Sequence, residues 1–235
     1  MCNSDFASKQ LSKILNRVSR AAKASNRDLS EIKIVAASKQ QPSTVIRTFH
    51  AAGISTVGEN YLQEALIKRE QLKDIDIDWH YIGKLQSNKC KAVAQNFSWV
   101  HTIDRLKLAQ RFDQYGKSFN TETFKPLNIL IQLNIDQEQS KAGIPIEQAP
   151  TLCAQVHELE NIRLRGFMLI PKPTKTPELQ RKPFEIARKT LENVNQRYGF
   201  KLDSLSMGMS NDLESAILEG STMIRIGTDL FGPRK

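Results

Sequence analysis

The sequence has few of the features that would place a protein in a membrane, outside the cell or around a metal. It contains only three cysteines, which lie far apart and form no C-x-x-C pair or other zinc-site spacing. No stretch approaches the roughly 18 uninterrupted apolar residues of a membrane helix, and the N-terminus lacks the apolar centre of a secretory signal. We therefore expect a cytoplasmic protein with reduced cysteines and with neither a membrane segment nor a metal site.

The positive charge is not gathered into a nucleic-acid-binding pattern. The formal net charge is +9, but Lys and Arg are scattered and mixed with acidic residues, as in "KRE". The chain also lacks an aromatic RNA-binding signature and helix-turn-helix spacing. A solvated basic surface is favoured over nucleic-acid binding, and a small anionic ligand remains compatible with the charge.

Low-complexity segments, internal repeats and Pro/Gly-rich linkers are absent, so we expect one domain over residues 1–235. An amphipathic helix is predicted at about 6–25, and β-branched runs then alternate with helical segments. The predicted strands are 32–38, 55–60, 79–84, 99–104, 127–135, 162–170, 204–209 and 223–227. This alternation predicts an α/β fold, a (β/α)₈ TIM barrel with an additional N-terminal helix. An open doubly wound sheet is the alternative, although no G-x-G-x-x-G opens the first strand-to-helix turn.

In such a barrel, functional side chains lie after the strands, where the loops meet in one mouth. Lys39 follows the first strand and Asn60 the second. In "SMGMSNDLESAILEG" we expect Ser210 to be the N-cap of a helix, and in "RIGTD" Gly227 permits close backbone approach while Thr228 offers a hydroxyl. Either segment alone is explained by an ordinary helix start, but together they favour a phosphate site.

Two basic residues decide which phosphate compound fits this mouth. Lys39 ends an apolar strand, and a partly buried lysine can form a Schiff base with an aldehyde. An aldehyde that carries a phosphate indicates pyridoxal 5'-phosphate (PLP). Arg225, if it reaches the pyridine nitrogen, can donate a hydrogen bond there but not readily a proton, since its pKa exceeds about 12. Alone, Lys39 is also explained as a solvated strand-end lysine and Arg225 as an ion-pair partner.

Motifs along nearly the whole chain resemble one family. The segments "IVAASKQQP", "GENYLQEA", "WHYIGKLQSNK", "VHTID", "LNIDQEQSKAGI", "GFMLIP", "SMGMSNDLESAI" and "MIRIGTDLFG" are similar, in order, to motifs of the pyridoxal phosphate homeostasis proteins. The resemblance implies a barrel like the N-terminal domain of alanine racemase, which is PLP fold type III. It also implies an aldimine between PLP and Lys39. The other implied PLP-binding residues are Asn60, Met207, Gly208, Ser210, Arg225, Gly227 and Thr228.

The catalytic machinery that the fold would need for racemisation is incomplete in this sequence. Racemisation requires two acid/base groups on opposite faces of the substrate Cα, and in racemases of this fold the second is a tyrosine from a further β domain. Only ten residues follow Arg225, so we expect no such domain. Two tyrosines lie near the ends of predicted strands and could in principle supply this group. However, Tyr61 begins a predicted helix and Tyr81 lies within a predicted strand. We therefore expect a non-catalytic carrier that holds PLP and delivers it to apoenzymes; an amino-acid racemase or another fold-type III enzyme is the alternative.

Two further expectations concern the carrier itself. Lys141, in the loop after the fifth strand, is a candidate second PLP acceptor, with a solvated loop lysine as the simpler interpretation. The absence of the racemase β domain removes the usual dimer contacts, so a monomer is favoured.

Overall fold

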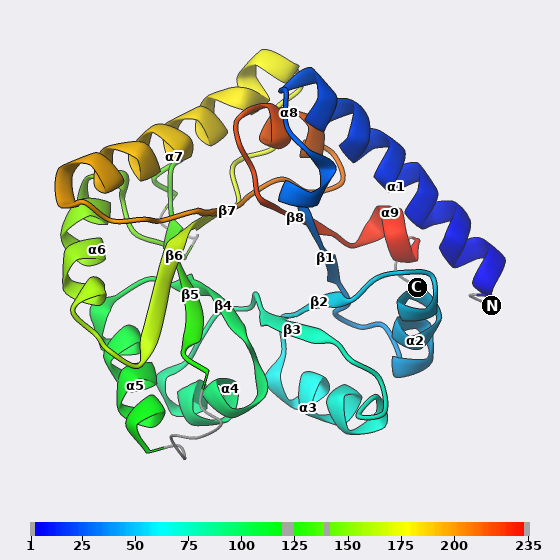
Figure 1. Ribbon diagram of the computed structural model, residues 1–235, viewed down its shortest axis with the longest axis horizontal. Helices are drawn as coiled ribbons and strands as arrows, with labels where there is room; N and C mark the ends of the chain where they lie inside the picture. Colours follow the sequence, from blue (N-terminus) through cyan, green and yellow to red (C-terminus); the bar gives the residue numbers. More distant parts are fainter. Residues whose placement is uncertain (1–2, 119–124, 139–141, 233–235) are drawn as a thin grey trace.

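A closed barrel of eight parallel strands forms the centre of the molecule (Figure 1). The computed structural model describes residues 3–118, 125–138 and 142–232. Its strands are β1 (Lys33–Ala37), β2 (Thr56–Glu59), β3 (Asp78–Tyr81), β4 (Trp99–Ile103), β5 (Leu127–Leu133), β6 (Ile162–Leu169), β7 (Ser204–Ser206) and β8 (Met223–Ile226). They pair in chain order, and β8 closes the ring on β1 with Ala36 opposite Ile226. The predicted barrel is confirmed, and the open doubly wound sheet is wrong.

The helices surround the barrel and cover the outer face of the strands (Figure 1). They are α1 (Ser4–Ala24), α2 (Ser43–Ala51), α3 (Leu62–Gln71), α4 (Cys90–Asn96), α5 (Leu106–Lys117), α6 (Ala149–His157), α7 (Pro177–Tyr198), α8 (Leu213–Leu218) and α9 (Thr228–Phe231), with short 3₁₀ turns at Leu29–Glu31, Ser87–Lys89 and Ile146–Gln148. None of the helices in the described part of the chain has the length and apolar character needed to cross a membrane.

The N-terminal helix α1 is an amphipathic helix with a capped start. Asn3 accepts a hydrogen bond from the backbone N–H of Phe6 at 2.9 Å, which satisfies one of the free donors of the first turn. Leu11, Ile14 and Val18 recur at helical spacing and are buried. With them α1 packs against α8, α9 and α2, so it lies beside the last segments of the chain (Figure 1).

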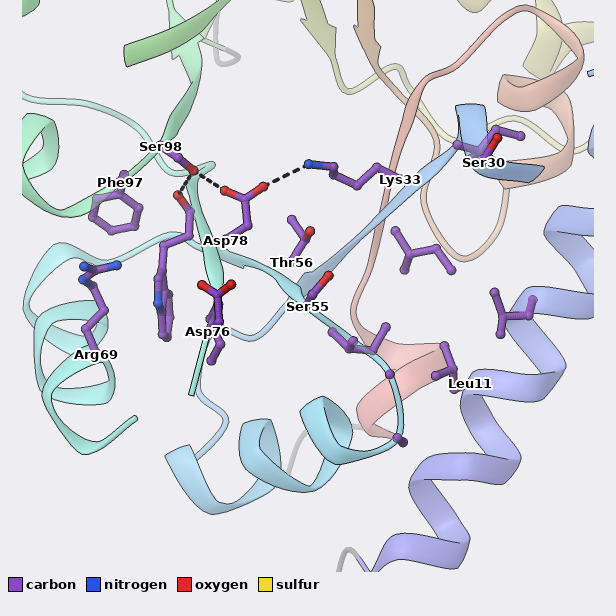
Figure 2. Close-up of a pocket in the computed structure, with 18 of the residues that line it drawn as sticks. Leu11, Ser30, Lys33, Ser55, Thr56, Arg69, Asp76, Asp78, Phe97 and Ser98 are labelled. Atoms are coloured by element: carbon purple, nitrogen blue, oxygen red, sulfur yellow. Dashed lines mark hydrogen bonds and ion pairs between the residues drawn. The ribbon is translucent and has the colours of Figure 1, made fainter. Parts of the chain in front are cut away.

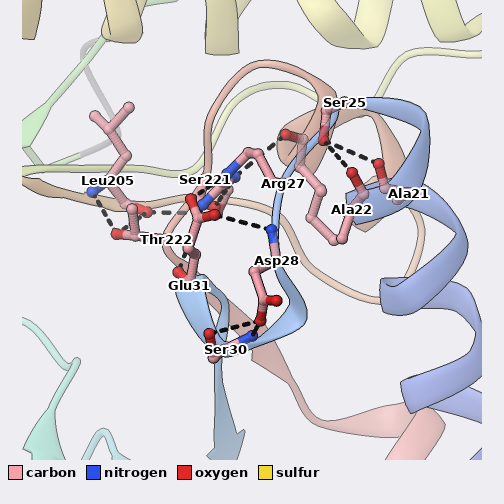
Figure 3. Close-up of polar contacts among 11 residues, drawn as sticks. Ala21, Ala22, Ser25, Arg27, Asp28, Ser30, Glu31, Leu205, Ser221 and Thr222 are labelled. Carbon is pink, nitrogen blue, oxygen red and sulfur yellow. Dashed lines mark hydrogen bonds and ion pairs between the residues drawn. The ribbon is translucent and has the colours of Figure 1, made fainter.

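The link from α1 to the first strand is fixed to the turn that precedes β8 (Figure 3). Arg27 Nη1 donates to the carbonyl oxygen of Ser221 at 2.7 Å. Asp28 and Glu31 form a capping box, in which Glu31 Oε1 accepts from the Asp28 backbone N–H at 2.8 Å. These contacts hold the start of β1 beside β8 and thereby help close the barrel.

The core has an outer layer and a smaller inner one. Most buried apolar side chains pack between the strands and the helices. A separate inner cluster comes from five different strands and fills the barrel interior: Val35, Trp99, Leu130, Met168 and Met223. Buried polar side chains accompany them there, namely His80, His101, Ser206 and Arg225. The barrel is therefore a packed solid, and binding must take place at its ends.

Candidate functional site

The loops after β1 and β8 come together at the carboxyl end of the barrel. β1 and β8 are neighbours, with Val35 opposite Arg225 in register. Lys39 lies two residues beyond β1, in a turn, and is partly exposed. Gly227 lies beside the end of β1: a Cβ on it would make an ordinary van der Waals contact, 3.4 Å from the carbonyl oxygen of Ala37, so the predicted close backbone approach does not itself require glycine here. The structure thus places the predicted lysine and the predicted glycine turn at the same end of two adjacent strands.

A buried ion pair anchors the turn that carries Lys39. Ser38 Oγ donates to Glu59 Oε1 at 2.5 Å, and Lys68 Nζ lies 2.7 Å from the same carboxylate oxygen. Lys68 also donates to the carbonyl oxygen of Ser38 at 2.8 Å. Gln40, on the other side of Lys39, has a positive φ of 63° and donates its backbone N–H to Glu64 Oε1 at 2.6 Å. Both neighbours of Lys39 are therefore held by α3 and the end of β2.

The electrostatics of this anchor depend on Lys68. Burial raises the pKa of Glu59, while the hydrogen bond and charge of Lys68 and the hydroxyl of Ser38 oppose that rise. Glu59 is fully buried, and its second oxygen, Oε2, has no hydrogen-bond partner among the described residues. A buried carboxylate with only one hydrogen-bonded oxygen lowers the stability of the folded protein. The ammonium of Lys68 is what offsets that cost.

Arg225 is held rigidly at the top of the barrel interior. Its side chain donates through Nη1 to Ser206 Oγ and through Nη2 to the carbonyl oxygen of Leu169, both at 2.8 Å. Burial lowers the pKa of Arg225 to about 10, and the charge of Asp212 opposes this shift. The guanidinium consequently keeps its charge at neutral pH and has a fixed orientation.

The turn after β7 differs from the one predicted. α8 begins at Leu213 and its N-cap is Asp212, so the prediction of Ser210 as the N-cap is wrong. The physical reason is that Asp212 Oδ1 accepts the backbone N–H of Met209 at 2.6 Å, which closes residues 209–212 into a turn ahead of the helix. Ser210 lies within this turn, and its carbonyl oxygen accepts from Arg17 Nη2 at 2.8 Å.

Arg17 of α1 joins the two turns that the sequence singled out. Its guanidinium binds both carboxylate oxygens of Glu214 on α8, at 2.6 and 2.8 Å. It also binds Asp229 Oδ2 on α9 at 2.7 Å. One arginine from the N-terminal helix thereby sets the spacing between the Ser210 turn and the start of α9.

The remaining predicted residues have well-defined places. Gly208 has a φ of 93°, and a Cβ there would lie 2.6 Å from Ala216 Cβ, so only glycine fits against α8. Met207 is fully buried in the outer core. The backbone of Asn60 is approached by Gly83, whose Cβ, if present, would lie 2.0 Å from the Asn60 carbonyl oxygen.

Thr228 and the two tyrosines occupy different environments. Thr228 is the first residue of α9, directly after Gly227. Tyr81 is 1% exposed, packs edge-on against Phe97 and donates its hydroxyl to the carbonyl oxygen of Lys84 at 3.3 Å. Tyr61 is the N-cap of α3 and is 54% exposed. Lys141 lies outside the described residues.

The groups that support this site were not predicted from the sequence. Glu59 stands inside the quoted "GEN" motif, and His80 and His101 stand inside "WHYIG" and "VHTID", but we assigned them no role. The available signal was polar side chains in otherwise apolar strands, which must find partners in a barrel interior. Lys68 gave no signal, because a lysine in an amphipathic helix is normally exposed. Within the described ranges, no three His, Cys, Asp or Glu side chains come together as a metal site.

The chain is similar to known proteins along nearly its whole length. A family model described as the alanine racemase N-terminal domain matches residues 10–235. The pyridoxal phosphate homeostasis protein of Pseudomonas aeruginosa is 45% identical over 224 residues, which cover 95% of this chain and 94% of that protein. The protein of the same name from Escherichia coli K12 is 42% identical over 230 residues, 95% of each chain. The solved structure of PipY from Synechococcus elongatus with PLP bound has a TM-score of 0.80 at 33% identity and covers 92% of this chain and 100% of PipY.

Proposed function

This chain belongs to the alanine racemase N-terminal domain family and, within it, to the pyridoxal phosphate homeostasis proteins, and from this premise we propose that it binds PLP through Lys39. The observation that supports the proposal is that a lysine and a buried, hydrogen-bonded arginine lie on or directly after two adjacent strands of a closed barrel. Lys39 leaves β1 and Arg225 lies on β8, the strand beside it. Relatives named for PLP homeostasis, and a PLP-bound structure of similar fold, support the same ligand.

The residues present fit the chemistry of PLP. We propose that the amine of Lys39 holds the aldehyde as a lysine aldimine, and that Arg225 faces the pyridine nitrogen as a hydrogen-bond donor. Gly227 contributes no side chain between the loops after β1 and β8. We propose that this segment, with Thr228 and the Ser210 turn, receives the phosphate. Asn60, Met207 and Gly208 complete the proposed site, Met207 and Gly208 through their backbone.

We propose that the protein carries PLP in the cytoplasm and delivers it to apoenzymes, without racemase activity of its own. A second acid/base group would have to face Lys39 across the substrate. Of the two tyrosines considered, Tyr81 is buried in the outer core and Tyr61 points from an exposed helix start. Neither environment supplies an opposed base, which favours a carrier acting as a single PLP-binding domain.

Reductive trapping tests the attachment. The purified protein is mixed with PLP and treated with borohydride, which reduces the imine formed with loss of water to a stable secondary amine, and the modified peptide is mapped by mass spectrometry. We expect the label on Lys39 and its loss in Lys39→Ala. Lys201→Ala is the matched control, because Lys201 is an exposed lysine that precedes β7 at the opposite end of the barrel. Undiminished labelling of Lys39→Ala would reject the proposed attachment.

Two further assays separate a carrier from an enzyme. In the first, PLP-loaded protein is mixed with a PLP-dependent apoenzyme, and we expect recovery of that enzyme's activity. In the second, the loaded protein is incubated with a panel of L-amino acids, and sustained formation of the D enantiomers would replace the carrier proposal with a racemase. If Lys141 is a transient second acceptor, Lys141→Ala should slow the transfer while leaving the label on Lys39 intact.

A further inference from the structure

A continuous line of buried polar side chains crosses the barrel interior from the mouth to the opposite end. Arg225 Nη1 donates to Ser206 Oγ, and His101 Nδ1 lies 2.9 Å from that same oxygen. His101 Nε2 lies 2.9 Å from His80 Nδ1, and His80 Nε2 lies 3.1 Å from Asp78 Oδ2. The contact between His101 on β4 and Ser206 on β7 crosses the barrel interior, because β5 and β6 separate these strands in the ring. The line therefore joins Arg225 to groups far from the mouth.

The far end of the line opens into a pocket at the start of the strands (Figure 2). The pocket has a volume of about 1110 Å³ and is lined by residues that precede or begin β1, β2, β3 and β4. Asp78 lies on its wall and is bound by Lys33 Nζ at 2.9 Å and by the hydroxyl of Ser98. The Asp78 side chain is 31% exposed, whereas the His80 and His101 side chains are fully buried. The Asp78 end is thus the end of the line that is in contact with solvent.

The chemistry of the end groups gives the line a direction. Arg225 can only donate and ionised Asp78 can only accept. With both imidazoles neutral, every group is satisfied when Ser206 donates to His101 Nδ1, His101 Nε2–H donates to His80 Nδ1, and His80 Nε2–H donates to Asp78. All the hydrogen bonds then run from Arg225 toward Asp78. In this arrangement the Ser206 hydroxyl presents its lone pairs to Arg225.

Addition of one proton to His80 reverses the middle of the line. His80 then donates from both nitrogens, so His101 must accept at Nε2 and carry its proton on Nδ1. His101 Nδ1–H consequently donates to Ser206 Oγ, and the Ser206 hydrogen must turn away from His101. Ser206 Oγ now accepts from His101 and Arg225 together. The hydroxyl is shared, and a second positive charge lies on the line that ends at Arg225.

The charges that face the two imidazoles favour the neutral arrangement at ordinary pH. Burial lowers the pKa of His80, against the opposing effect of Asp78, and Lys33 lowers it further. Burial lowers the pKa of His101 well below its ordinary value, with contributions from His80 and from Arg225. Asp78 stays ionised, because hydrogen bonds from His80, Ser98 and Lys33 outweigh the effect of its burial and lower its pKa.

The remaining charges lie outside this line. Trp99 stacks on His80 with ring centroids 5.4 Å apart, and the Arg165 guanidinium lies 5.0 Å from the Trp99 ring centroid. Arg165 is itself paired with Asp203 at 2.6 Å. Asp212 is the acidic group that acts on Arg225, and burial raises the pKa of Asp212. None of these contacts provides His80 or His101 with another proton acceptor.

We propose that Asp78, His80, His101 and Ser206 form a proton-linked positioning line for Arg225. While both imidazoles are neutral, the line presents the Ser206 oxygen to the guanidinium; when His80 becomes doubly protonated, the hydrogen bonds between His80 and Ser206 reverse and the support of Arg225 weakens. Acidification would then loosen PLP at the mouth. The effect on PLP rests on the proposed function, whereas the line itself does not.

Nitrogen NMR of the histidine side chains tests the line without any ligand. The chain has four histidines, so ¹⁵N-labelled protein gives a small spectrum in which substitution of His50, His157 and His80 in turn assigns all four. At neutral to mildly alkaline pH we expect His80 and His101 both as the Nε2–H tautomer. On acidification, His101 should change to the Nδ1–H tautomer over the same pH range in which His80 becomes doubly protonated. Asp78→Asn should shift this change to lower pH.

The control is Asp76→Asn, which removes a carboxylate from the same pocket but not from the line (Figure 2). This variant should leave the pH of the tautomer change where it is in the unchanged protein. An Nδ1–H tautomer of His101 at neutral pH would overturn the direction of the line. A tautomer change that does not follow His80, or unfolding of the protein before His80 takes up its proton, would overturn the proton linkage.

PLP titrations test the effect at the mouth. We expect the affinity for PLP to fall over the same acidic range as the His80 titration. Ser206→Ala should weaken PLP binding about tenfold at neutral pH, as expected for loss of a hydrogen bond to a charged group, and should remove this part of the pH dependence. An unchanged pH dependence in Ser206→Ala would overturn the link to Arg225. Failure to bind PLP at any pH would refute the proposed function instead. The NMR measurement of the histidine tautomers would still test the positioning line independently.

Discussion

Lys68 Nζ lies 2.7 Å from Glu59 Oε1, and both side chains are almost completely removed from solvent. The same ammonium binds the carbonyl oxygen of Ser38, the residue before Lys39. The position of the proposed PLP lysine therefore depends on an ion pair between α3 and the end of β2. This pair connects the stability of the barrel with the geometry of the site.

Lys68→Met should be strongly destabilising. Removal of one partner of a buried ion pair leaves an uncompensated charge, at a cost of about 3–5 kcal/mol. Glu59, whose pKa burial already raises, would then take up a proton more readily. When the pKa of a carboxyl group is higher in the folded than in the unfolded state, the free energy of unfolding falls as the pH rises through the folded-state pKa. The destabilisation by Lys68→Met should therefore be larger at alkaline than at mildly acidic pH. Urea unfolding at several pH values measures this.

The double variant Lys68→Met/Glu59→Gln is the control for the ion pair. Glutamine keeps the shape of Glu59 without its charge, so the double variant should be more stable than Lys68→Met alone at alkaline pH. Equal stability of the two would contradict the assignment of the loss to a stranded carboxylate. A pH-independent loss in Lys68→Met would do the same.

Arg17→Ala should loosen the two turns at the carboxyl end of β7 and β8. Arg17 bridges Glu214, Asp229 and the carbonyl oxygen of Ser210, and all three contacts would be lost together. Because the network is partly exposed, we expect a loss of about 1–2 kcal/mol in unfolding free energy. Amide hydrogen exchange should rise most in residues 209–213 and 227–231. Exchange that rises equally around the whole barrel would contradict this local role.

Gly208→Ala should lower the free energy of unfolding more than Gly199→Ala does. Both glycines have a positive φ, but only Gly199 has free space for an added methyl group. At Gly208 a methyl group would meet Ala216 Cβ at 2.6 Å, and φ is 93°. At Gly199, with a φ of 70°, nothing lies within 4 Å of the added Cβ. We expect Gly199→Ala to cost about 1 kcal/mol from the backbone alone and Gly208→Ala about 2–4 kcal/mol, because overpacking adds to the strain. Thermal or urea unfolding of both variants measures the difference.

The sequence predicted the fold well, because strand and helix periods are local properties. All eight strands and the N-terminal helix lie where hydrophobic periodicity placed them. Two strands were predicted to continue three residues too far: the third was predicted to reach residue 84 but ends at Tyr81, and the seventh was predicted to reach residue 209 but ends at Ser206. Two residues after Ser206, Gly208 adopts a φ of 93°, far from the extended backbone of a strand, and the sequence alone does not reveal which glycines do so.

The support of the site could be predicted only in part. Lys39 and Arg225 were found because strand ends in a barrel converge, which is a property of the fold. The partners that hold them lie far away in the chain: Lys68 is 30 residues from Ser38, and His101 is 105 residues from Ser206. Which of many helix lysines turns inward, and which two strand histidines meet, depends on the register between strands and helices. Periodicity within one segment carries no information about that register.

The last prediction concerns the pH dependence of stability. Burial lowers the pKa of both His80 and His101, so both are neutral in the folded protein, whereas the unfolded chain takes up protons near the ordinary histidine value of about 6.5. Below that pH the unfolded state binds more protons than the folded state, and the free energy of unfolding must fall. It should level off only where the folded histidines are themselves protonated. Unfolding midpoints measured from neutral to acidic pH give this slope.

A histidine variant separates this effect from that of the carboxylates. His101→Gln keeps a side-chain donor near the position of Nε2 but cannot be protonated, so it should be less stable at neutral pH and show a shallower loss on acidification. The pKa of Asp78 is lowered in the folded protein, so its stabilising effect is lost only below the ordinary pKa of an aspartate, which is well below that of a histidine. In the variant, the fall in unfolding free energy caused by Asp78 should therefore remain at this lower pH. If the unfolding free energy of His101→Gln fell with pH below about 6.5 as steeply as that of the unchanged protein, the His101 imidazole would not be the source of this pH dependence. Only a group that takes up protons in that range can produce it.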